Sequence, residues 1–250
     1  MDDITFNRFE NFVAEVTDFK EEFCKIKDYD AVSFELKEDE TPVTQVDYSI
    51  EQSIRESIAE TFPYHSIVGE EYPDTIHKSS FKWIIDPIDG TFSLTKGVPL
   101  YGTLLGLLKD NSPMYGSVRF PLLQKLICGD GKSAYENGET IICDNSVTLG
   151  ESLILTTDEN RIKLSKYKSS WERLNDLVSN RRTWGDCYGY YLVCSGKAQV
   201  MFDIDLKPCD ILPLIPIIKG AGCEIIELEK PFKDIIVCAK SLKQEILECF

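Results

Sequence analysis

Hydrophobic residues recur at every third or fourth position near the start of the chain, a spacing typical of amphipathic helices that cover a core. Residues 9–26 carry one such stripe, which predicts a single helix. Residues 46–58 carry a second stripe, and Thr44 just before it is the expected N-cap. Two short apolar runs follow at residues 66–68 and 81–85, and each ends in acidic residues. They predict buried strands that deliver carboxylates at their carboxyl ends.

The pattern changes at residue 101 and becomes typical of a β-meander. Short apolar stretches alternate with turn residues, including an Asn-Gly pair at 137–138. Residues 144–150 are polar, and strand-like and helix-like stretches alternate beyond them, with a helix expected over residues 211–220. We therefore expect an α+β fold in two lobes that meet in the polar segment. These are an α+β lobe over residues 1–145 and an α/β lobe over residues 146–250.

Composition and charge exclude several classes of function. The 250 residues contain 42 acidic and 27 basic side chains, a formal net charge of −15, which repels nucleic acid and anionic membranes. The longest uncharged apolar stretch, residues 211–218, is far shorter than the roughly 20 residues of a membrane span. The N-terminus lacks the basic-then-apolar order of a signal peptide, so we expect a cytoplasmic protein. The nine cysteines have no metal-binding spacing and are expected to be free and buried.

The most informative segment is WIIDPIDGT at residues 83–91, where an apolar strand ends in Asp86 and Asp89. Two carboxylates this close repel each other unless a cation lies between them, and oxygen ligands without histidine or thiolate favour Mg²⁺ over zinc. Gly90 allows the backbone to approach a phosphate, whose oxygens the N–H groups of Gly90 and Thr91 would bind. The segment also fits an ordinary turn, but the combination favours a site for Mg²⁺ and phosphate.

Three other acidic segments have ordinary explanations when each is taken alone. The GEE sequence at residues 69–71 fits an exposed loop with solvated glutamates. Thr44, Asp47 and Glu51 fit a helix cap followed by a charged helix face. Asp210, ahead of an apolar helix, fits a helix N-cap. Only their convergence in the fold would make these carboxylates a site.

The four segments together carry a resemblance to a known family. Over residues 37–223 the sequence resembles the inositol monophosphatase-like phosphatases, which are Mg²⁺-dependent and lithium-sensitive, in its TxxD helix start, GEE segment, DPxDGT segment and late helix-opening aspartate. The resemblance implies the layered α/β/α/β/α sandwich of the sugar phosphatases and two or three Mg²⁺ ions. It implies as metal ligands the side chains of Glu70, Asp86, Asp89 and Asp210 and the main-chain carbonyl of Ile88.

The resemblance also implies the reaction, which is hydrolysis of a small phosphate monoester by a metal-activated water. Thr91 and Asp47 would orient and deprotonate this water, Glu70 would take part in catalysis, and Thr44 and Glu71 would support the site. The ions would lower the pKa of the water, neutralise the phosphate and allow a strongly acidic protein to bind an anion. Family members often dimerise, so a homodimer is expected by analogy.

The later segments resemble the histidinol-phosphate phosphatase branch of the superfamily, on the sequences GDCY, LKPCDILPLIPIIKGAG and PLYGTLLGLL. Inositol phosphatases usually carry small residues where this chain has Asp186, and a carboxylate there would pair with a substrate ammonium. Asp203 matches the acidic substrate ligand of the family, usually a glutamate. Asp186 also fits a helix N-cap, and Cys209 replaces the aromatic residue that usually precedes the late aspartate. L-histidinol phosphate is the preferred substrate on this interpretation.

Two alternatives remain open from the sequence. The first is inositol 1-phosphate as the substrate, with other monoesters of the family ranked below it. The second is a catalytically silent, acidic interaction module that keeps the fold, against which the intact set of candidate ligands argues.

Overall fold

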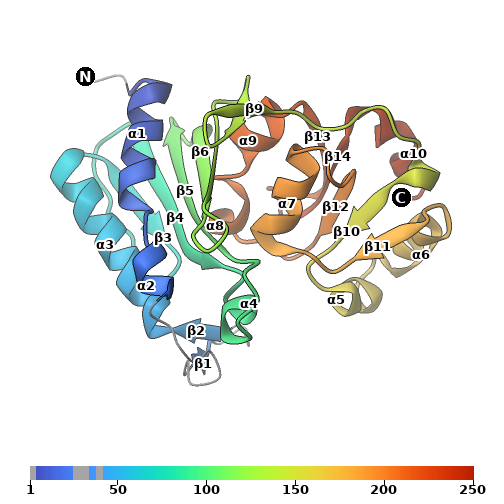
Figure 1. The fold of residues 1–250 in the computed structure, drawn as a ribbon, viewed down its shortest axis with the longest axis horizontal. Coiled ribbons are helices and arrows are strands. Elements are labelled where there is room, and N and C mark those ends of the chain that lie inside the picture. The colour runs from blue at the N-terminus through green and yellow to red at the C-terminus, as the bar shows by residue number, and fades with distance from the viewer. Residues whose placement is uncertain (1–3, 25–33, 38–41) are drawn as a thin grey trace.

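Helices and two β-sheets alternate in five layers, in the order α/β/α/β/α, across the computed structural model (Figure 1). The structure describes residues 4–24, 34–37 and 42–250. The layered α+β sandwich implied by the resemblance is therefore confirmed. Among the helices in these ranges, none has the length and apolar composition that crossing a bilayer requires.

The first sheet has seven strands that follow one another in sequence order. They are β3 (Ser66–Gly69), β4 (Phe81–Asp89), β5 (Gly102–Lys109), β6 (Ser112–Phe120), β7 (Lys125–Gly129), β8 (Ala134–Glu136) and β9 (Glu139–Ile141). β3 and β4 are parallel, and every later pair is antiparallel, which confirms the expected meander. Its turns use residues that tolerate positive φ, since Asp110, Asn111, Asn137 and Gly138 have φ angles between 49° and 86°.

The outer face of this sheet is covered by α1 (Phe6–Val16) and α3 (Gln45–Thr61), with α2 (Lys20–Cys24) beside them (Figure 1). The single helix expected over residues 9–26 is wrong, because α1 ends at Val16 and α2 begins at Lys20; position 26 lies outside the described residues. The buried Thr17 hydroxyl donates a hydrogen bond of 2.6 Å to the Val13 carbonyl, a local bond that competes with helix continuation.

A two-stranded ribbon of β1 (Phe34–Leu36) and β2 (Pro42–Thr44) precedes α3. Thr44 ends β2 and caps α3, because its Oγ1 accepts a hydrogen bond from the Val46 N–H (3.1 Å). The expected N-cap is confirmed.

The second sheet is mixed, with the strand order β11-β10-β12-β14-β13. Its strands are β10 (Leu153–Leu155), β11 (Asn180–Arg182), β12 (Val200–Asp203), β13 (Cys223–Glu229) and β14 (Asp234–Ala239). The outer helices are α5 (Glu159–Leu164), α6 (Lys168–Asp176) and α10 (Lys243–Leu247), and their apolar residues share one buried cluster with the sheet. Two 3₁₀ turns, η2 (Leu149–Glu151) and η3 (Lys240–Leu242), complete this layer.

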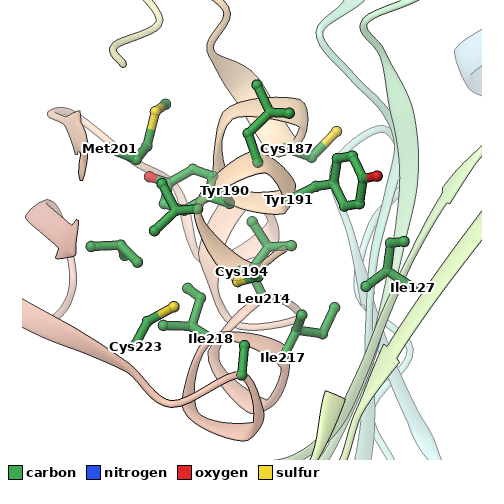
Figure 2. Packing of buried hydrophobic residues seen from close by; sticks show 14 of the residues in the cluster. Ile127, Cys187, Tyr190, Tyr191, Cys194, Met201, Leu214, Ile217, Ile218 and Cys223 are labelled. Atoms are coloured by element: carbon green, nitrogen blue, oxygen red, sulfur yellow. The ribbon is translucent and has the colours of Figure 1, made fainter. Parts of the chain in front are cut away.

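The middle layer contains α7 (Asp186–Cys194), α8 (Pro208–Ile211) and α9 (Ile215–Gly220), and Figure 2 shows its side chains packed toward both sheets. Glycines on the first sheet permit this contact, since a Cβ built on Gly116 would lie 1.7 Å from the Pro213 carbonyl oxygen. The continuous helix expected over residues 211–220 is wrong: the segment divides into α8 and α9 around Pro213, which has no N–H to continue a helix.

The expected lobe boundary at residue 145 falls between the two sheets, but α8 and α9, which follow it in sequence, pack on the first sheet. The division into lobes 1–145 and 146–250 therefore stays a prediction. Eight cysteines within the described residues are free and buried, as expected.

Candidate metal and phosphate site

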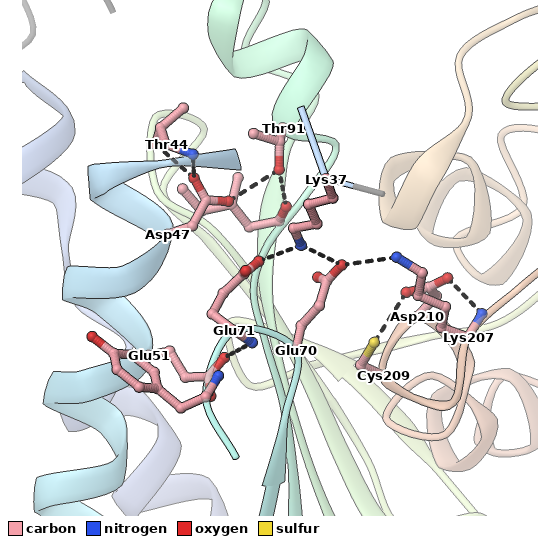
Figure 3. A network of polar contacts seen from close by, with 12 residues as sticks. Lys37, Thr44, Asp47, Glu51, Glu70, Glu71, Thr91, Lys207, Cys209 and Asp210 are labelled. Carbon is pink, nitrogen blue, oxygen red and sulfur yellow. Dashed lines mark hydrogen bonds and ion pairs between the residues drawn. The ribbon is translucent and has the colours of Figure 1, made fainter. Parts of the chain in front are cut away.

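One cavity of about 1040 Å³ gathers most of the residues that the sequence proposes for a site. Strand ends of both sheets and the starts of α7, α8 and the short helix α4 (Thr91–Thr95) form its wall. Thr44, Asp47 and Glu71 are not in the wall (Figure 3). Asp47 is hydrogen-bonded to Thr91 of the wall and to Thr44, and Glu71 is linked through Lys37 to Glu70 of the wall. The proposed residues in the wall are Glu70, Asp86, Ile88, Asp89, Gly90, Thr91, Asp186, Asp203 and Asp210.

The strand pairing explains why Glu70 and Asp86 meet. β3 and β4 run parallel with Gly69 paired to Ile85, so the next residue of each strand is an acid at the same sheet edge. The register of β4 against β5 then shifts between Asp86 and Asp89. Such an irregularity re-aims side chains, and both aspartates line the cavity.

Burial and like charge act together on these carboxyl groups. Burial, followed by the nearby charge of Glu70, raises the pKa of Asp86 well above its ordinary value. Burial, followed by the charge of Asp186, does the same for the pKa of Asp89. Burial also raises the pKa of Asp210 to about 6. A cation shared by these groups would relieve their repulsion.

An orphaned oxygen and the chemistry of the donors fit a hard divalent cation at this place. Asp86 is only 1% exposed, and its Oδ1 has no hydrogen-bond partner among the described residues. Buried polar atoms nearly always have a partner, so the exception needs an explanation such as an ion. The proposed ligands all offer oxygen atoms, which Mg²⁺ prefers. The residues present therefore fit Mg²⁺.

Asp210 reaches the site from the start of α8. Its Oδ2 accepts a hydrogen bond from the Lys207 N–H (2.8 Å), so it closes the helix start from the third helical position instead of serving as the N-cap. The Cys209 thiol donates to Asp210 Oδ1 (3.3 Å). Asp210 can therefore close the start of α8 with one carboxylate oxygen and still line the cavity as a candidate metal ligand.

A hydrogen-bonded chain connects the first turn of α3 to the cavity (Figure 3). Asp47 Oδ2 accepts hydrogen bonds from the Thr44 N–H (2.8 Å) and the Thr44 hydroxyl (2.6 Å). The Thr91 hydroxyl lies 3.1 Å from Asp47 Oδ1 and 2.8 Å from the Ile88 carbonyl oxygen. Burial raises the pKa of Asp47, which makes it a stronger proton acceptor than an exposed aspartate.

The charged helix face expected for Asp47 and Glu51 is wrong, because both side chains are buried. Glu51 Oε2 accepts a hydrogen bond from the Glu71 N–H (2.8 Å), and Glu51 Oε1 accepts one from the Arg55 guanidinium (2.7 Å). The solvated loop expected for GEE is also wrong. Glu51 holds this loop through its hydrogen bond to the Glu71 N–H, and the Glu71 side chain is largely buried.

Asp186 and Asp203 lie in the same wall, and the charge of Asp186 contributes to the raised pKa of Asp89. The Thr157 hydroxyl donates to Asp203 Oδ2 (2.8 Å) and accepts from the Asp186 N–H (2.9 Å), which ties the two segments together. Burial raises the pKa of Asp186 to about 6 and that of Asp203 to about 7, and the nearby Arg161 opposes both shifts. Asp186 is the first residue of α7, whose N-cap is Gly185, so the N-cap alternative for Asp186 is wrong.

Comparison with known protein families shows to which family the chain belongs. The sequence matches the family described as "Inositol monophosphatase family" over residues 13–248. The chain belongs to the inositol monophosphatase family. It is accordingly a phosphatase, a phosphoric monoester hydrolase, and the alternative of a catalytically silent acidic module is not supported.

Curated relatives agree with membership of this family, and a solved structure shares the fold. A protein of Chlorobaculum parvum named "Histidinol-phosphatase" is 35% identical over 187 residues, which cover 74% of this chain and 72% of the relative. A protein of Aquifex aeolicus named "Fructose-1,6-bisphosphatase/inositol-1-monophosphatase" is 32% identical, covering 92% and 88%. The solved structure of the extragenic suppressor protein suhB from Bartonella henselae superposes with a TM-score of 0.89 at 19% identity, covering 96% and 97%.

Two lysines of this inositol monophosphatase family member were not singled out from the sequence as site residues. Lys37 Nζ forms ion pairs with Glu70 (2.8 Å) and Glu71 (2.6 Å), and Lys207 Nζ lies 3.4 Å from Glu70 (Figure 3). Lys207 precedes the late aspartate by three residues, so its position beside that motif was an available signal. Lys37 stands in a polar link with no motif, where no comparable signal exists.

Proposed function

We propose that this phosphatase hydrolyses L-histidinol phosphate in a Mg²⁺-dependent reaction. The observation that carries the proposal is the shared cavity, whose wall contains the Asp86 carboxylate cluster together with Asp186 and Asp203. A phosphate monoester with an amino group offers its phosphate to the Mg²⁺ that the cluster would hold and its ammonium to Asp186 and Asp203, whereas a neutral polyol has no charged group for these two aspartates.

The proposed ligands of Mg²⁺ are the side chains of Glu70, Asp86, Asp89 and Asp210, with the Ile88 carbonyl. When bound, divalent ions of this kind lower the pKa of water and neutralise phosphate charge. The unpartnered Asp86 oxygen and the raised carboxyl pKa values support this assignment. The number of ions, two or three, and their identity as Mg²⁺ belong to the proposal.

Thr91 and Asp47 form the proposed path for the proton of the attacking water. A threonine hydroxyl has one hydrogen, so Thr91 donates either to Asp47 or to the Ile88 carbonyl at a given moment. When it donates to Asp47, its oxygen accepts a hydrogen bond from water in the cavity. As the water oxygen forms its bond to phosphorus, the bond between phosphorus and the ester oxygen breaks, and the leaving alkoxide takes a proton from solvent water. The proton of the attacking water passes to Thr91 Oγ1, and the Thr91 proton passes to Asp47 Oδ1.

Gly90 has a left-handed conformation (φ 90°) and precedes the first turn of α4. The N–H groups of a first turn have no partners within their helix, so those of Gly90 and Thr91 are the proposed donors to phosphate oxygens. A Cβ at position 90 would lie 3.1 Å from both Asp186 Oδ2 and the Leu100 carbonyl oxygen, so a side chain there would crowd the wall.

Asp186 and Asp203 are the proposed partners of the substrate ammonium. Supporting this, the Chlorobaculum relative is named for histidinol phosphate, and this chain has carboxylates at both positions. Inositol 1-phosphate is the second candidate, favoured by the name of the Aquifex relative, which aligns over 92% of this chain. Homodimer formation and a cytoplasmic location remain proposals from the sequence.

The test measures kcat/KM of the purified protein with Mg²⁺ on L-histidinol phosphate, N-acetyl-histidinol phosphate and inositol 1-phosphate. L-Histidinol phosphate is expected to be best. Asp186→Asn should lower its kcat/KM by roughly 10- to 100-fold, since a hydrogen bond to a charged group is worth about 1.5–3 kcal/mol. The same substitution should have little effect on the N-acetyl compound, which has no ammonium.

Asp158→Asn is the matched control, because Asp158 also lines the cavity but caps α5 with its side chain, and asparagine caps equally well. It removes the same charge and should change the rate only slightly. Fastest hydrolysis of inositol 1-phosphate, with no loss in Asp186→Asn, would contradict the substrate assignment. Absence of Mg²⁺-dependent phosphate release from every monoester would contradict the whole proposal.

A further inference from the structure

A thiol lies inside the proposed carboxylate site. Cys209 is the second residue of α8, and α8 packs against β4, the strand that carries Asp86. One ligand atom from each of Glu70, Asp86 and Cys209 lies within 4.8 Å of the other two. These residues come from three segments that are distant in the sequence, so tertiary packing alone creates the cluster.

The surroundings of Cys209 direct its sulfur toward the acids. Its side chain is 7% exposed and packs beside Ile84 and Leu108 on one side. On the other side its thiol donates to Asp210 Oδ1 at 3.3 Å, and Figure 3 shows it next to Glu70. The sulfur therefore lies at the boundary between a small apolar cluster and the carboxylate group.

A second observation points to a ligand at the same place. Asp86 is almost fully buried, and its Oδ1 has no hydrogen-bond partner among the residues that the structure describes. The cluster consists of two carboxylates, one of which has the unpartnered oxygen, and a thiol, so it offers both hard and soft donors. Soft thiolate donors favour Zn²⁺ and its heavier relatives over Mg²⁺, which binds oxygen ligands.

We propose that Cys209, Glu70 and Asp86 form a mixed thiolate and carboxylate site that binds a borderline or soft divalent cation, Zn²⁺ or Cd²⁺, in competition with Mg²⁺. On binding, the S–H bond of Cys209 breaks, a metal–sulfur bond forms, and the proton leaves to the solvent, so the hydrogen bond to Asp210 is lost. The inference rests on the proposed function, because Glu70 and Asp86 are also proposed Mg²⁺ ligands. It predicts that the enzyme is unusually sensitive to thiophilic metals.

The experiment uses the full chain, stripped of metal by a chelator and then titrated with Cd²⁺. Thiolate-to-cadmium charge-transfer absorption reports the metal–sulfur bond without any reference to turnover. In the wild-type protein one such signal should appear and should be displaced by excess Mg²⁺. A thiolate signal that persists unchanged in Cys209→Ser would assign the metal to other cysteines and overturn the proposal.

Cys209→Ser keeps the size of the side chain and replaces the soft donor with a hard one. It should lower the ratio of Cd²⁺ affinity to Mg²⁺ affinity at least about tenfold. Cys249→Ser is the matched control, since Cys249 is 3% exposed, lies near the C-terminus and packs in a separate apolar cluster with Phe202 and Ile246. An unchanged ratio in Cys209→Ser would contradict the inference.

X-ray absorption of the Zn²⁺-loaded wild-type protein tests directly whether sulfur is a zinc ligand. This test does not depend on whether the variant folds. One sulfur at about 2.3 Å among oxygen neighbours is expected, and a shell of oxygen and nitrogen alone would overturn the proposal. The two failures are separable, because a phosphatase with normal Mg²⁺-dependent turnover and no zinc–sulfur bond refutes only this inference. Absence of Mg²⁺-dependent turnover refutes the proposed function instead.

Discussion

Replacing Asp86 by asparagine should stabilise the metal-free protein and abolish its stabilisation by Mg²⁺. Asp86 is 1% exposed, one of its oxygens has no partner, and Glu70 and Asp89 add like charge around it. A buried polar group left unsatisfied costs about 1–3 kcal/mol, and more when it is charged. Asparagine has the same shape without the charge, so we expect a gain of about 2 kcal/mol, or roughly 4–8 °C in Tm for a chain of this size.

The same substitution removes a proposed metal ligand, which reverses the order of stability when Mg²⁺ is present. At a Mg²⁺ concentration of about 100 times its Kd, binding adds about 2.7 kcal/mol to the wild-type protein. The variant should gain almost nothing, so the wild-type protein becomes the more stable of the two by about 0.7 kcal/mol on these figures. Thermal unfolding followed by circular dichroism, with EDTA and then with Mg²⁺, measures both differences.

Asp234→Asn is the matched control, because Asp234 is also buried but accepts a hydrogen bond from the Asp205 N–H (3.0 Å). It should not be stabilised in EDTA and should retain the full Mg²⁺ shift. The reasoning fails if Asp86→Asn is less stable than wild type without metal, or if it gains as much as wild type from Mg²⁺.

Substitutions at three further positions test the proposed site. Burial raises the pKa of Asp203 to about 7, so the metal-free native protein holds a proton that the unfolded chain releases near pH 4, and stability falls as pH rises between these values. The free energy of unfolding of Asp203→Asn, relative to that of wild type, should therefore rise by up to about 4 kcal/mol between about pH 4 and about pH 7. Denaturant unfolding measures it, and a difference between the two proteins that does not change with pH would contradict this. Thr91→Val should lower kcat by about 10²- to 10⁴-fold while Thr91→Ser stays within about tenfold of wild type; equal losses would exclude the hydroxyl as a proton carrier. A Cβ on Gly69 would lie 2.0 Å from Glu51 Oε1, so Gly69→Ala should displace the carboxylate that holds the Glu71 N–H. It should destabilise the protein by about 1–3 kcal/mol and weaken Mg²⁺ binding in calorimetric titration, and an unchanged affinity would show that Glu51 does not position the site.

Local patterns predicted the elements that carry the site. The alternation of apolar and turn residues after position 101 gave the meander, and Thr44 was identified as the cap of α3. The strand at residues 81–85 with its terminal aspartates was also predicted, because a buried strand needs a continuous apolar run whatever its partners. Residues 9–26 and 211–220 were each predicted as one helix, but each segment is divided in the structure. The spacing of apolar residues alone does not predict such breaks.

The chemistry of the candidate site was only partly visible along the chain. The motif around Asp86 and Asp89 indicated a divalent cation, since few structural needs place two carboxylates so close. The burial of Glu51 was not predicted, because its role depends on a loop twenty residues away. The ion pairs of Lys37 and the position of the Cys209 thiol were likewise invisible, since each depends on segments that meet only in the folded protein.

The sequence by itself determined which short stretches become strands, turns and capped helices, because those preferences depend on neighbours a few residues apart. It also determined which acids were available for a metal. Only the tertiary structure decided that these acids share one cavity with Asp186, and that a cysteine lies among them. The physical reason is that electrostatic coupling and metal binding depend on distances in space, which parallel strand pairing and helix packing set between residues far apart in the chain.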